Sequence, residues 1–350
     1  MRRDLSCDNR NRLGAWPALL RRRQTGQGVF FGSVLICLRW VRRCRGARGC
    51  RSTAATKSGH YQRRSSFDRD TIQLVSIQIE MHSAVTISLI PEARGAPFVF
   101  RDDLAAGCEK AAALGFDAVE VFPRSAQELD VQQLKKLLAQ HGLGLAAVGT
   151  GAGRVVHKLS LTDPDAETRR CAQEFAAAIV EVAGGLGAPA IIGSMQGCWE
   201  GGLTRDQALG WLAEAIEELA RRAQNHGVSL LVEPLNRYET NLLTNVADSL
   251  DLLKKLRAQN VKLLCDLFHM NIEEASIADA LRRAGPQLGH LHFVDSNRRA
   301  VGFGHTDIAP VVQALRDIGY AGYVSGEVLP LPDSETAAKQ TVESFKKWFR

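Results

Sequence analysis

Paired cysteines are missing from this sequence. It has eight cysteines but no Cys-x-x-Cys spacing: Cys7, Cys37, Cys44 and Cys50 lie in the first fifty residues, and the other four stand singly. A disulfide framework or a zinc knuckle requires paired spacing, usually in a short secreted chain. The absence argues against both, and we expect reduced thiols in a cytoplasmic protein.

The basic start of the chain also lacks an apolar run long enough for a membrane span. Its uncharged run from Gly26 to Leu38 falls short of the roughly 20 residues that a transmembrane helix needs. Arg21–Arg23 precede this run, as in a signal peptide, but Arg39, Arg42 and Arg43 follow it where a small-residue cleavage site would lie. We therefore expect neither a membrane partner nor a cleaved signal.

Positive charge is scarce beyond that start. Residues 1–80 hold 17 of the 44 Lys and Arg but 5 of the 38 Asp and Glu, which leaves 27 basic against 33 acidic residues in residues 81–350. A surface that follows nucleic acid needs clustered Lys and Arg to neutralise phosphates. We therefore expect no nucleic-acid partner, although the formal net charge of the whole chain is +6.

The same break in composition divides the chain at residue 80. We interpret residues 1–80 as a basic extension that is either disordered or a mis-assigned start. Met81 is followed directly by the strand-like segment Ala84–Ile90. The folded protein is expected to be a single domain over residues 81–350.

Short apolar runs alternate with longer amphipathic segments from Met81 onward. In Asp206–Ala223, for example, apolar residues recur every three to four positions, which is typical of a helix that covers a sheet. This alternation indicates repeated βα units and a parallel sheet, and eight units in about 265 residues match a (β/α)8 TIM barrel. A last helix is expected at Glu335–Phe349. The eight apolar runs are residues 85–90, 118–122, 145–148, 190–192, 229–232, 261–265, 288–294 and 322–325.

Glycine-rich phosphate loops are also missing. Neither Gly-x-Gly-x-x-Gly nor Gly-x-x-x-x-Gly-Lys-Ser/Thr follows any of the eight runs. A doubly wound sheet that binds dinucleotides or nucleoside triphosphates needs one of these loops for its phosphates. The α/β fold class is therefore better explained by the barrel than by a doubly wound sheet.

Four side chains that can bind a metal end four successive apolar runs: Glu233, Asp266, His292 and Glu327. In a TIM barrel, the carboxyl ends of the strands converge on the face that carries the chemistry. One such carboxylate could belong to an ordinary salt bridge, but three carboxylates and an imidazole on neighbouring strands would repel one another unless a cation neutralised them. The oxygen-rich set suits Mn²⁺ best, with Mg²⁺ or Co²⁺ as alternatives.

Longer segments surround these four residues, namely Glu233–Glu239, Asp266–Glu274, and Gly289–His292 with Asn297–Arg298. Together they resemble the tagatose/psicose 3-epimerase family of the xylose-isomerase-like TIM barrels. Further segments are most similar to the branch that acts on 5-keto-L-gluconate. The resemblance extends from about residue 84 to the C-terminus, and residues 1–80 have no counterpart in it. The segments similar to the 5-keto-L-gluconate branch are Gly149–Gly151, Leu159–Thr162, His292–Arg298, Gly302–His305 and Glu327–Pro332.

The resemblance implies a role for each matching residue. It makes Glu233 and Glu327 the catalytic acid/base pair as well as two of the metal ligands, with Asp266 and His292 as the other two. Leu267 departs from the family pattern, in which Thr often follows the aspartate, but this removes no ligand. The residues implied to hold the carbonyl and hydroxyl end of the substrate are Glu239, His269 and Arg298.

The implied reaction is epimerisation at C3 of a ketose or keto-sugar acid, such as 5-keto-L-gluconate or D-tagaturonate. A proton would leave the carbon next to the ketone and return on the opposite face, through a metal-stabilised enediolate. Without a basic phosphate cradle in residues 81–350, an unphosphorylated small-molecule substrate is favoured. A homo-oligomer is left open.

Two other activities are known on such barrels. An aldose–ketose or hydroxypyruvate isomerase would use the same enediolate chemistry between C1 and C2. An apurinic-site endonuclease would need extra histidine ligands and a basic face, but His157, His226 and His305 do not fall at matching strand ends.

The roles of several further residues are left open by the sequence. Glu120 could reach the pocket or pair with an arginine, and His290 could support the metal site or be a core histidine bonded to backbone. Trp199 lies in a glycine-containing loop that is either a lid or an ordinary surface loop. His305 is a candidate contact for a substrate carboxylate.

Overall fold

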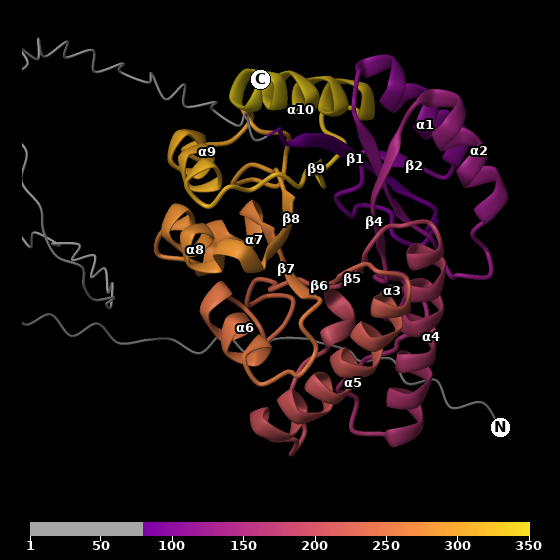
Figure 1. The fold of residues 1–350 in the computed structure, drawn as a ribbon, viewed down its shortest axis with the longest axis vertical. Coiled ribbons are helices and arrows are strands. Elements are labelled where there is room, and N and C mark those ends of the chain that lie inside the picture. Colours follow the sequence, from indigo (N-terminus) through magenta and orange to yellow (C-terminus); the bar gives the residue numbers. More distant parts are fainter. Residues whose placement is uncertain (1–79) are drawn as a thin grey trace, which may run out of the picture. The chain divides into compact units, whose positions relative to one another are not determined.

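The computed structural model describes residues 80–350, in which strands and helices alternate (Figure 1). The expected basic extension over residues 1–80 therefore lies outside the described residues, apart from Glu80. The strands are β1 (His82–Ser88), β2 (Phe100–Arg101), β3 (Ala118–Phe122), β4 (Gly144–Gly149), β5 (Ala190–Ile192), β6 (Leu230–Val232), β7 (Val261–Asp266), β8 (Leu288–His292) and β9 (Tyr323–Gly326). The α-helices are α1 (Leu104–Leu114), α2 (Val131–His141), α3 (Ala152–Val155), α4 (Ala166–Gly185), α5 (Arg205–Asn225), α6 (Val246–Leu253), α7 (Leu267–Glu273), α8 (Ile277–Ala284), α9 (Ile308–Asp317) and α10 (Ser334–Phe349), with short 3-10 helices η1 (Ser194–Gln196) and η2 (Gly285–Gln287).

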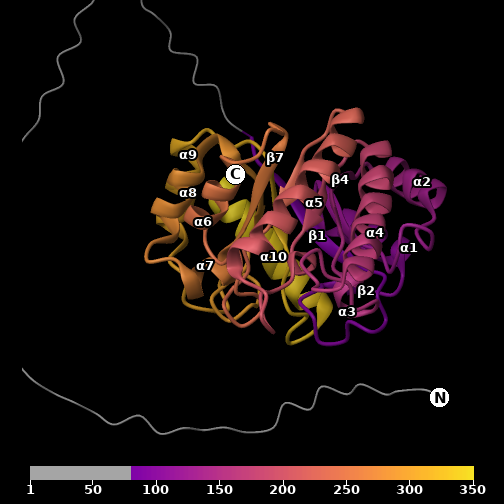
Figure 2. The same ribbon diagram turned by 90° about the horizontal axis from the view of Figure 1, so that it is seen from below.

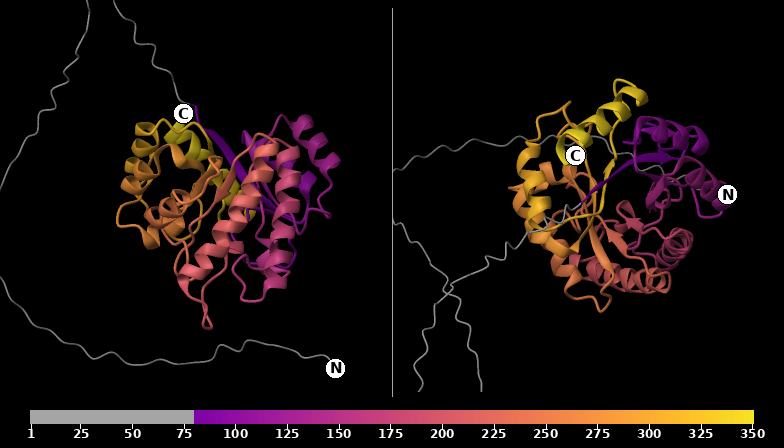
Figure 3. Two further views of the ribbon diagram at one scale, coloured as in Figure 1. Left: turned by 60° about the horizontal axis from the view of Figure 1, so that its bottom comes forward. Right: turned by 45° about the horizontal axis from the view of Figure 1, so that its top comes forward.

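The strands form a closed parallel barrel. Each strand from β3 to β9 pairs with the next, and β1 pairs with both β3 and β9, while the two-residue β2 is added beside β1. The helices lie outside the strands (Figures 1 and 2), with α1 to α5 on one side of the ring and α6 to α10 on the other (Figure 3, right). The predicted (β/α)8 barrel is confirmed, and all eight predicted runs overlap β1 or β3 to β9.

Local sequence signals explain where the helices begin and end. Helix α5 begins with a capping box, in which the Thr204 side chain accepts from the backbone N–H of Gln207 and Gln207 returns a bond to the Thr204 backbone. Helix α1 starts at Asp103, whose carboxylate accepts from a free N–H group of the first turn, and stops at Gly115, which has a φ of 84°. Such signals set where the helices join the connections to the neighbouring strands.

The last helix completes the barrel next to its first strand. Helix α10 packs on α1, β1 and β9, and Phe345 is buried at this contact. The final residue, Arg350, pairs with Asp117 at 2.7 Å, and Asp117 also accepts hydrogen bonds from the backbone and side chain of Ser83. These contacts hold the amino-end side of the barrel together, away from the carboxyl ends of the strands.

The helices of residues 80–350 contain no stretch that could cross a bilayer. None of them combines the necessary length with the necessary apolar character.

Candidate active site and metal centre

Four acidic or imidazole side chains meet at the carboxyl ends of four neighbouring strands. Glu233 directly follows β6, Asp266 ends β7, His292 ends β8 and Glu327 directly follows β9. One ligand atom from each lies within 4.8 Å of the others. The strand-end pattern in the sequence therefore does bring these four residues together.

The nitrogen at the centre of this cluster faces three carboxylates. His292 Nδ1 lies 3.4 Å from Asp266 Oδ2 and 3.6 Å from both Glu233 Oε1 and Glu327 Oε2. Asp266 Oδ2 and His292 Nδ1 are buried, and neither has a hydrogen-bond partner within residues 80–350. Because a buried polar atom without a partner costs about 1–3 kcal/mol, two such atoms at one point indicate a binding site for a ligand.

The donor set fits a hard divalent cation. Three carboxylates and one imidazole nitrogen suit Mn²⁺, Mg²⁺ or Co²⁺ better than a structural zinc ion. Asp266 shows how the backbone orients one ligand: its Oδ1 accepts from the backbone N–H of Phe268 at 2.7 Å at the start of α7, which leaves Oδ2 directed to the cluster. Gly193 leaves room for another, because a Cβ at Gly193 would lie 2.4 Å from Glu233 Oε2.

The protein groups by themselves favour protons on part of the cluster. Burial raises the pKa of Glu327 to about 8, against the lowering effect of His292. Burial opposes a charge on His292, but Glu120 and Glu327 hold the pKa of this imidazole well above its usual range. Burial also opposes the ionised form of Asp266, but His269 and His292 keep the pKa of that carboxyl below its usual range. A divalent cation would take the place of these protons, because metal ligands bind in their deprotonated forms.

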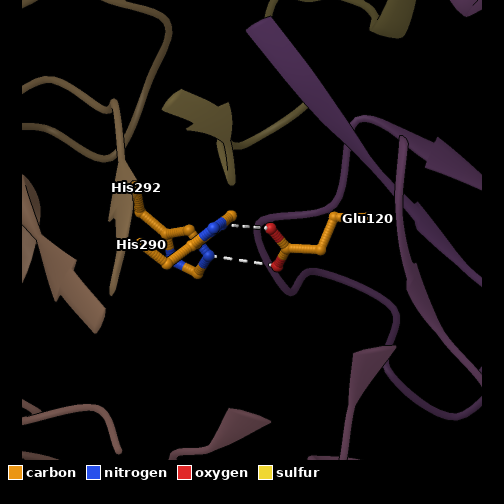
Figure 4. A group of neighbouring side chains, drawn as sticks. All are labelled: Glu120, His290 and His292. Carbon is orange, nitrogen blue, oxygen red and sulfur yellow. Dashed lines mark hydrogen bonds and ion pairs between the residues drawn. The ribbon is translucent and has the colours of Figure 1, made fainter. Parts of the chain in front are cut away.

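Glu120 supports His292 from across the barrel (Figure 4). The carboxylate of this β3 residue accepts from His290 Nε2 at 2.8 Å and from His292 Nε2 at 3.1 Å, and all three residues are almost completely buried. Although burial opposes its ionised form, the charges of His292 and His290 hold the pKa of Glu120 below its usual range. Both sequence interpretations of Glu120 were wrong, since its partners are these histidines. His290 likewise bonds to this carboxylate and not to the backbone, and its support of a metal site stays a prediction.

His269 presents one ring nitrogen to the same cluster. Its Nδ1 faces two N–H donors of Asn236, the backbone at 3.2 Å and the side chain at 2.7 Å, so the proton of the neutral ring belongs on Nε2. Nε2 is buried without a hydrogen-bond partner in the described chain and lies 3.9 Å from both Glu233 Oε1 and Asp266 Oδ2. His269 can therefore donate a hydrogen bond to an oxygen atom bound beside the cluster.

Arg298 supplies a positive charge at the edge of the cluster. Its guanidinium donates to Glu327 Oε2 at 3.2 Å and to Glu239 Oε1 at 3.0 Å, and it lies over the ring of Phe268. Burial works to lower the pKa of Arg298, but Glu327 and Asp266 hold it above its usual range. The structure thus places all three residues predicted to hold the substrate beside the cluster of Glu233, Asp266, His292 and Glu327.

The loop that carries Arg298 is organised by Asp295, a residue that the sequence interpretation missed. The buried Asp295 carboxylate accepts from the backbone N–H groups of Ser296, Gly302, Gly304 and Thr306. These bonds hold the loop in which Arg298 has a φ of 58°, an uncommon value for a non-glycine residue. An aspartate that directly precedes a loop with two nearby glycines is the sequence signal that could have identified it.

A pocket of about 320 Å³ opens beside the cluster. Its polar side contains Glu233, Glu239, His269, Arg298 and Glu327, and Arg298 is the only Lys or Arg among the described residues that line it. The rest of the lining, the apolar wall, is mostly apolar and includes Phe98, Phe122, Val155, Ile191 and Leu329. The pocket therefore combines charged side chains with an apolar wall.

Two further candidates lie outside this pocket. Trp199 is not among the described residues that line it; its indole instead donates to the Asn241 backbone at 3.0 Å, as expected for an ordinary surface loop. His305 is exposed and likewise absent from the described lining. Neither position supports the lid or the carboxylate contact considered from the sequence.

The three histidines that an endonuclease site would recruit lie apart from the cluster. His157 is exposed and approaches the Arg124 carbonyl oxygen, and His226 ends α5 and pairs with Glu181 at 2.7 Å. Neither they nor His305 belong to a group of potential metal ligands in residues 80–350. The histidine-rich set of an endonuclease is thus not formed.

Comparison with known proteins agrees with this geometry. A family model described as xylose isomerase-like TIM barrel matches residues 108–348. The chain is also similar to the solved structure of D-allulose 3-epimerase from Methylomonas sp. in complex with D-allulose. The TM-score is 0.66 at 25% identity, over 77% of this chain and 98% of that one.

Curated relatives are similar over most of the barrel. D-psicose 3-epimerase from Ruminiclostridium cellulolyticum is 35% identical over 62% of this chain and 75% of the relative. L-ribulose 3-epimerase from Mesorhizobium japonicum is 33% identical over 61% of this chain and 71% of the relative. The chain therefore belongs to the xylose isomerase-like TIM barrel family, and it is an isomerase of the sugar-epimerase kind.

Proposed function

We propose that this enzyme epimerises a ketose at C3 with the help of one bound divalent cation. The observation that carries the proposal is that Asp266 Oδ2 and His292 Nδ1, two buried atoms without a hydrogen-bond partner within residues 80–350, meet the carboxylates of Glu233 and Glu327. The names of the relatives, psicose and ribulose 3-epimerases, support C3 as the reacting carbon.

The cation would be held by Glu233, Asp266, His292 and Glu327. Mn²⁺ is our first choice because three carboxylates and an imidazole form a mostly hard donor set, and Mg²⁺ and Co²⁺ are alternatives. When bound, a divalent cation supplies Lewis-acid stabilisation for negative charge on the substrate oxygens next to the reacting carbon.

Glu233 and Glu327 are the proposed proton-transfer pair. They extend from β6 and β9, which are separated around the barrel by β7 and β8, so their carboxylates approach the cluster from different strands. A substrate carbon between them could lose its proton to one carboxylate and receive a proton from the other on the opposite face. Inversion follows from having two bases, and each can contribute about 10²–10⁴-fold to the rate.

Three residues would hold the reacting end of the sugar. The Nε2–H of His269 points to the cluster and can donate to the carbonyl oxygen, where negative charge develops. Arg298 is positioned by Glu239 and Glu327 and can share that charge. Glu239 is the most exposed of the three and can accept from a substrate hydroxyl.

The pocket favours an uncharged ketose over the keto-sugar acid that the sequence also suggested. A terminal carboxylate placed against Phe98, Phe122 and Val155 would lose its hydration without gaining a counter-charge. Arg298, the one Lys or Arg of the described lining, is already paired with two carboxylates. The apolar wall instead suits the carbon skeleton of a neutral sugar and excludes water from the reacting end.

An isotope experiment tests the proposal. The full chain is incubated with Mn²⁺ in deuterated water with psicose, tagatose, ribulose, 5-keto-L-gluconate and D-tagaturonate, and products are analysed by NMR. We expect deuterium at C3 with inversion, and faster turnover of a neutral ketose than of either acid. Formation of an aldose with deuterium at C2, or of ketose with deuterium at C1, would instead show the isomerase. Faster turnover of an acid would contradict the assignment of an uncharged substrate.

A further inference from the structure

One carboxylate inside the barrel serves two histidines at once. Glu120 reaches from β3 to the β8 pair His290 and His292, which are about 170 residues later in the chain, and each carboxylate oxygen accepts from one Nε2 (Figure 4). The described lining of the pocket includes neither Glu120 nor either histidine. The proposed reaction therefore assigns Glu120 no contact with substrate.

The composition of this trio resembles a cation site, but its contacts do not. Both carboxylate oxygens and both Nε2 atoms are already hydrogen-bonded to one another, at 2.8 and 3.1 Å. None of the four atoms is among the partnerless buried atoms of residues 80–350, in contrast to His292 Nδ1 on the other side of the ring. A second metal would have to displace both bonds, so the trio is better explained as a hydrogen-bonded group.

The direction of these bonds determines which nitrogen of His292 faces the main cluster. An ionised carboxylate only accepts hydrogen bonds, so the proton of a neutral His292 must remain on Nε2. The lone pair is then on Nδ1, the atom that lies 3.4 Å from Asp266 Oδ2 and 3.6 Å from Glu233 and Glu327. We propose that Glu120 is a positioning residue that fixes the ring and tautomer of His292 for cation binding, an inference that rests on the metal centre proposed above.

The backbone supports this arrangement on both strands. The register between β3 and β4 shifts at Val119/Glu120, and the register between β7 and β8 shifts at Leu263/Leu264, where Gly289 is passed over. A Cβ at Gly289 would lie 2.6 Å from the Cβ of Lys262, so the irregularity depends on glycine there. Such irregularities turn side chains to new directions beside active sites.

Because His290 also bonds to the side chain at position 120, a carboxylate there cannot be replaced by an amide without changing one of the two histidine bonds. With two acceptor oxygens, Glu120 can hold both imidazoles with their protons on Nε2. A glutamine at the same place has one acceptor oxygen and one NH2 group, so one of the two rings must accept through Nε2 and carry its proton on Nδ1. Glu120→Gln is therefore expected to keep the packing while leaving the His292 tautomer divided between two states.

The test measures the Mn²⁺ dissociation constant of the full chain by calorimetry after metal removal. We expect Glu120→Ala to raise this constant about 10–100-fold, the usual effect of losing a partner behind a metal-bound histidine. Glu120→Gln should raise it less, as a partial rescue. Asp117→Asn is the matched control, because it also weakens a carboxylate network, here a partly buried one on the amino-end side of the barrel. It should lower the melting temperature without changing the dissociation constant.

The outcomes separate this inference from the proposed function. A wild type that binds no divalent cation would overturn the metal centre and the positioning role together. A wild type that binds Mn²⁺ while Glu120→Ala and Glu120→Gln bind it equally well would overturn the positioning role alone. If Glu120→Ala does not fold, Glu120→Gln decides. In addition, ¹H–¹⁵N correlation spectra of the Mg²⁺-loaded protein should show His292 protonated at Nε2, and a proton at Nδ1 would contradict the assignment.

Discussion

Glu327→Gln is the substitution for which the structure makes the sharpest prediction. Glu327 is buried among His292, Glu233 and Arg298, and its raised pKa of about 8 means that burial keeps it largely protonated when no cation is present. Glutamine has nearly the same shape as that protonated form. The free energy of unfolding of the metal-free variant should therefore stay within about 1 kcal/mol of wild type, although Arg298 exchanges a carboxylate for an amide oxygen.

The catalytic effect should be much larger. Loss of one of the two proposed bases is expected to lower kcat by about 10²–10⁴-fold at saturating Mn²⁺, with metal content confirmed by elemental analysis. Glu233 remains in place, so the C3 proton of one epimer should still exchange with deuterated water without inversion. A metal-loaded Glu327→Gln enzyme with more than a tenth of the wild-type kcat would refute the two-base reasoning.

Three further changes have predictable effects. Removal of metal by a chelator should lower the melting temperature, measured by scanning calorimetry, by roughly 5–10 °C. The reference is protein with free Mn²⁺ at 100 times its dissociation constant, because binding at that concentration stabilises the folded protein by about 2.7 kcal/mol. Gly193→Ala places a Cβ 2.4 Å from Glu233 Oε2 and should weaken Mn²⁺ binding and kcat, whereas Gly210→Ala, with nothing within 4 Å, should change neither. Asp295→Asn should cost about 1.5–3 kcal/mol at neutral pH in urea unfolding. Despite burial, four backbone N–H groups hold the pKa of Asp295 below its usual range. The stabilisation that this carboxylate gives the wild type is therefore complete at neutral pH and is lost as pH falls below about 4. The variant should lose less stability over that interval, and an equal loss would argue against this account.

The four cluster residues were predictable because each stands at the end of an apolar run. A strand in a parallel barrel is buried on both sides, so an acid or histidine that ends it is recognisable from neighbouring residues alone. The apolar runs also located the eight strands, and the last helix was placed within one residue of α10. Such local sequence signals do not depend on the contacts that distant parts of the chain make.

Contacts between distant parts of the chain were not predictable in the same way. Glu120 was expected to meet an arginine or the pocket, but its partners are two histidines on a strand across the barrel. The register of β3 and β8 shifts near these residues, and a lone glycine such as Gly289 signals an irregularity in a strand but not which side chains meet across the barrel. Asp295 was missed for a related reason, because its four backbone partners lie near its carboxylate only in the folded conformation of the loop that follows.

The pocket described above is built by two different halves of the chain. The proposed ligands and proton-transfer groups all come from β6 and later elements, whereas Phe98, Phe122 and Val155 of the apolar wall come from before β5. Substitutions in the first half can therefore reshape the wall and change which sugar fits without altering any reacting group. Glu120 is the exception, because it reaches from the first half to support a ligand of the second. A gene fragment that encoded only the second half would contain every proposed ligand but would lack Glu120, the residue proposed to orient His292.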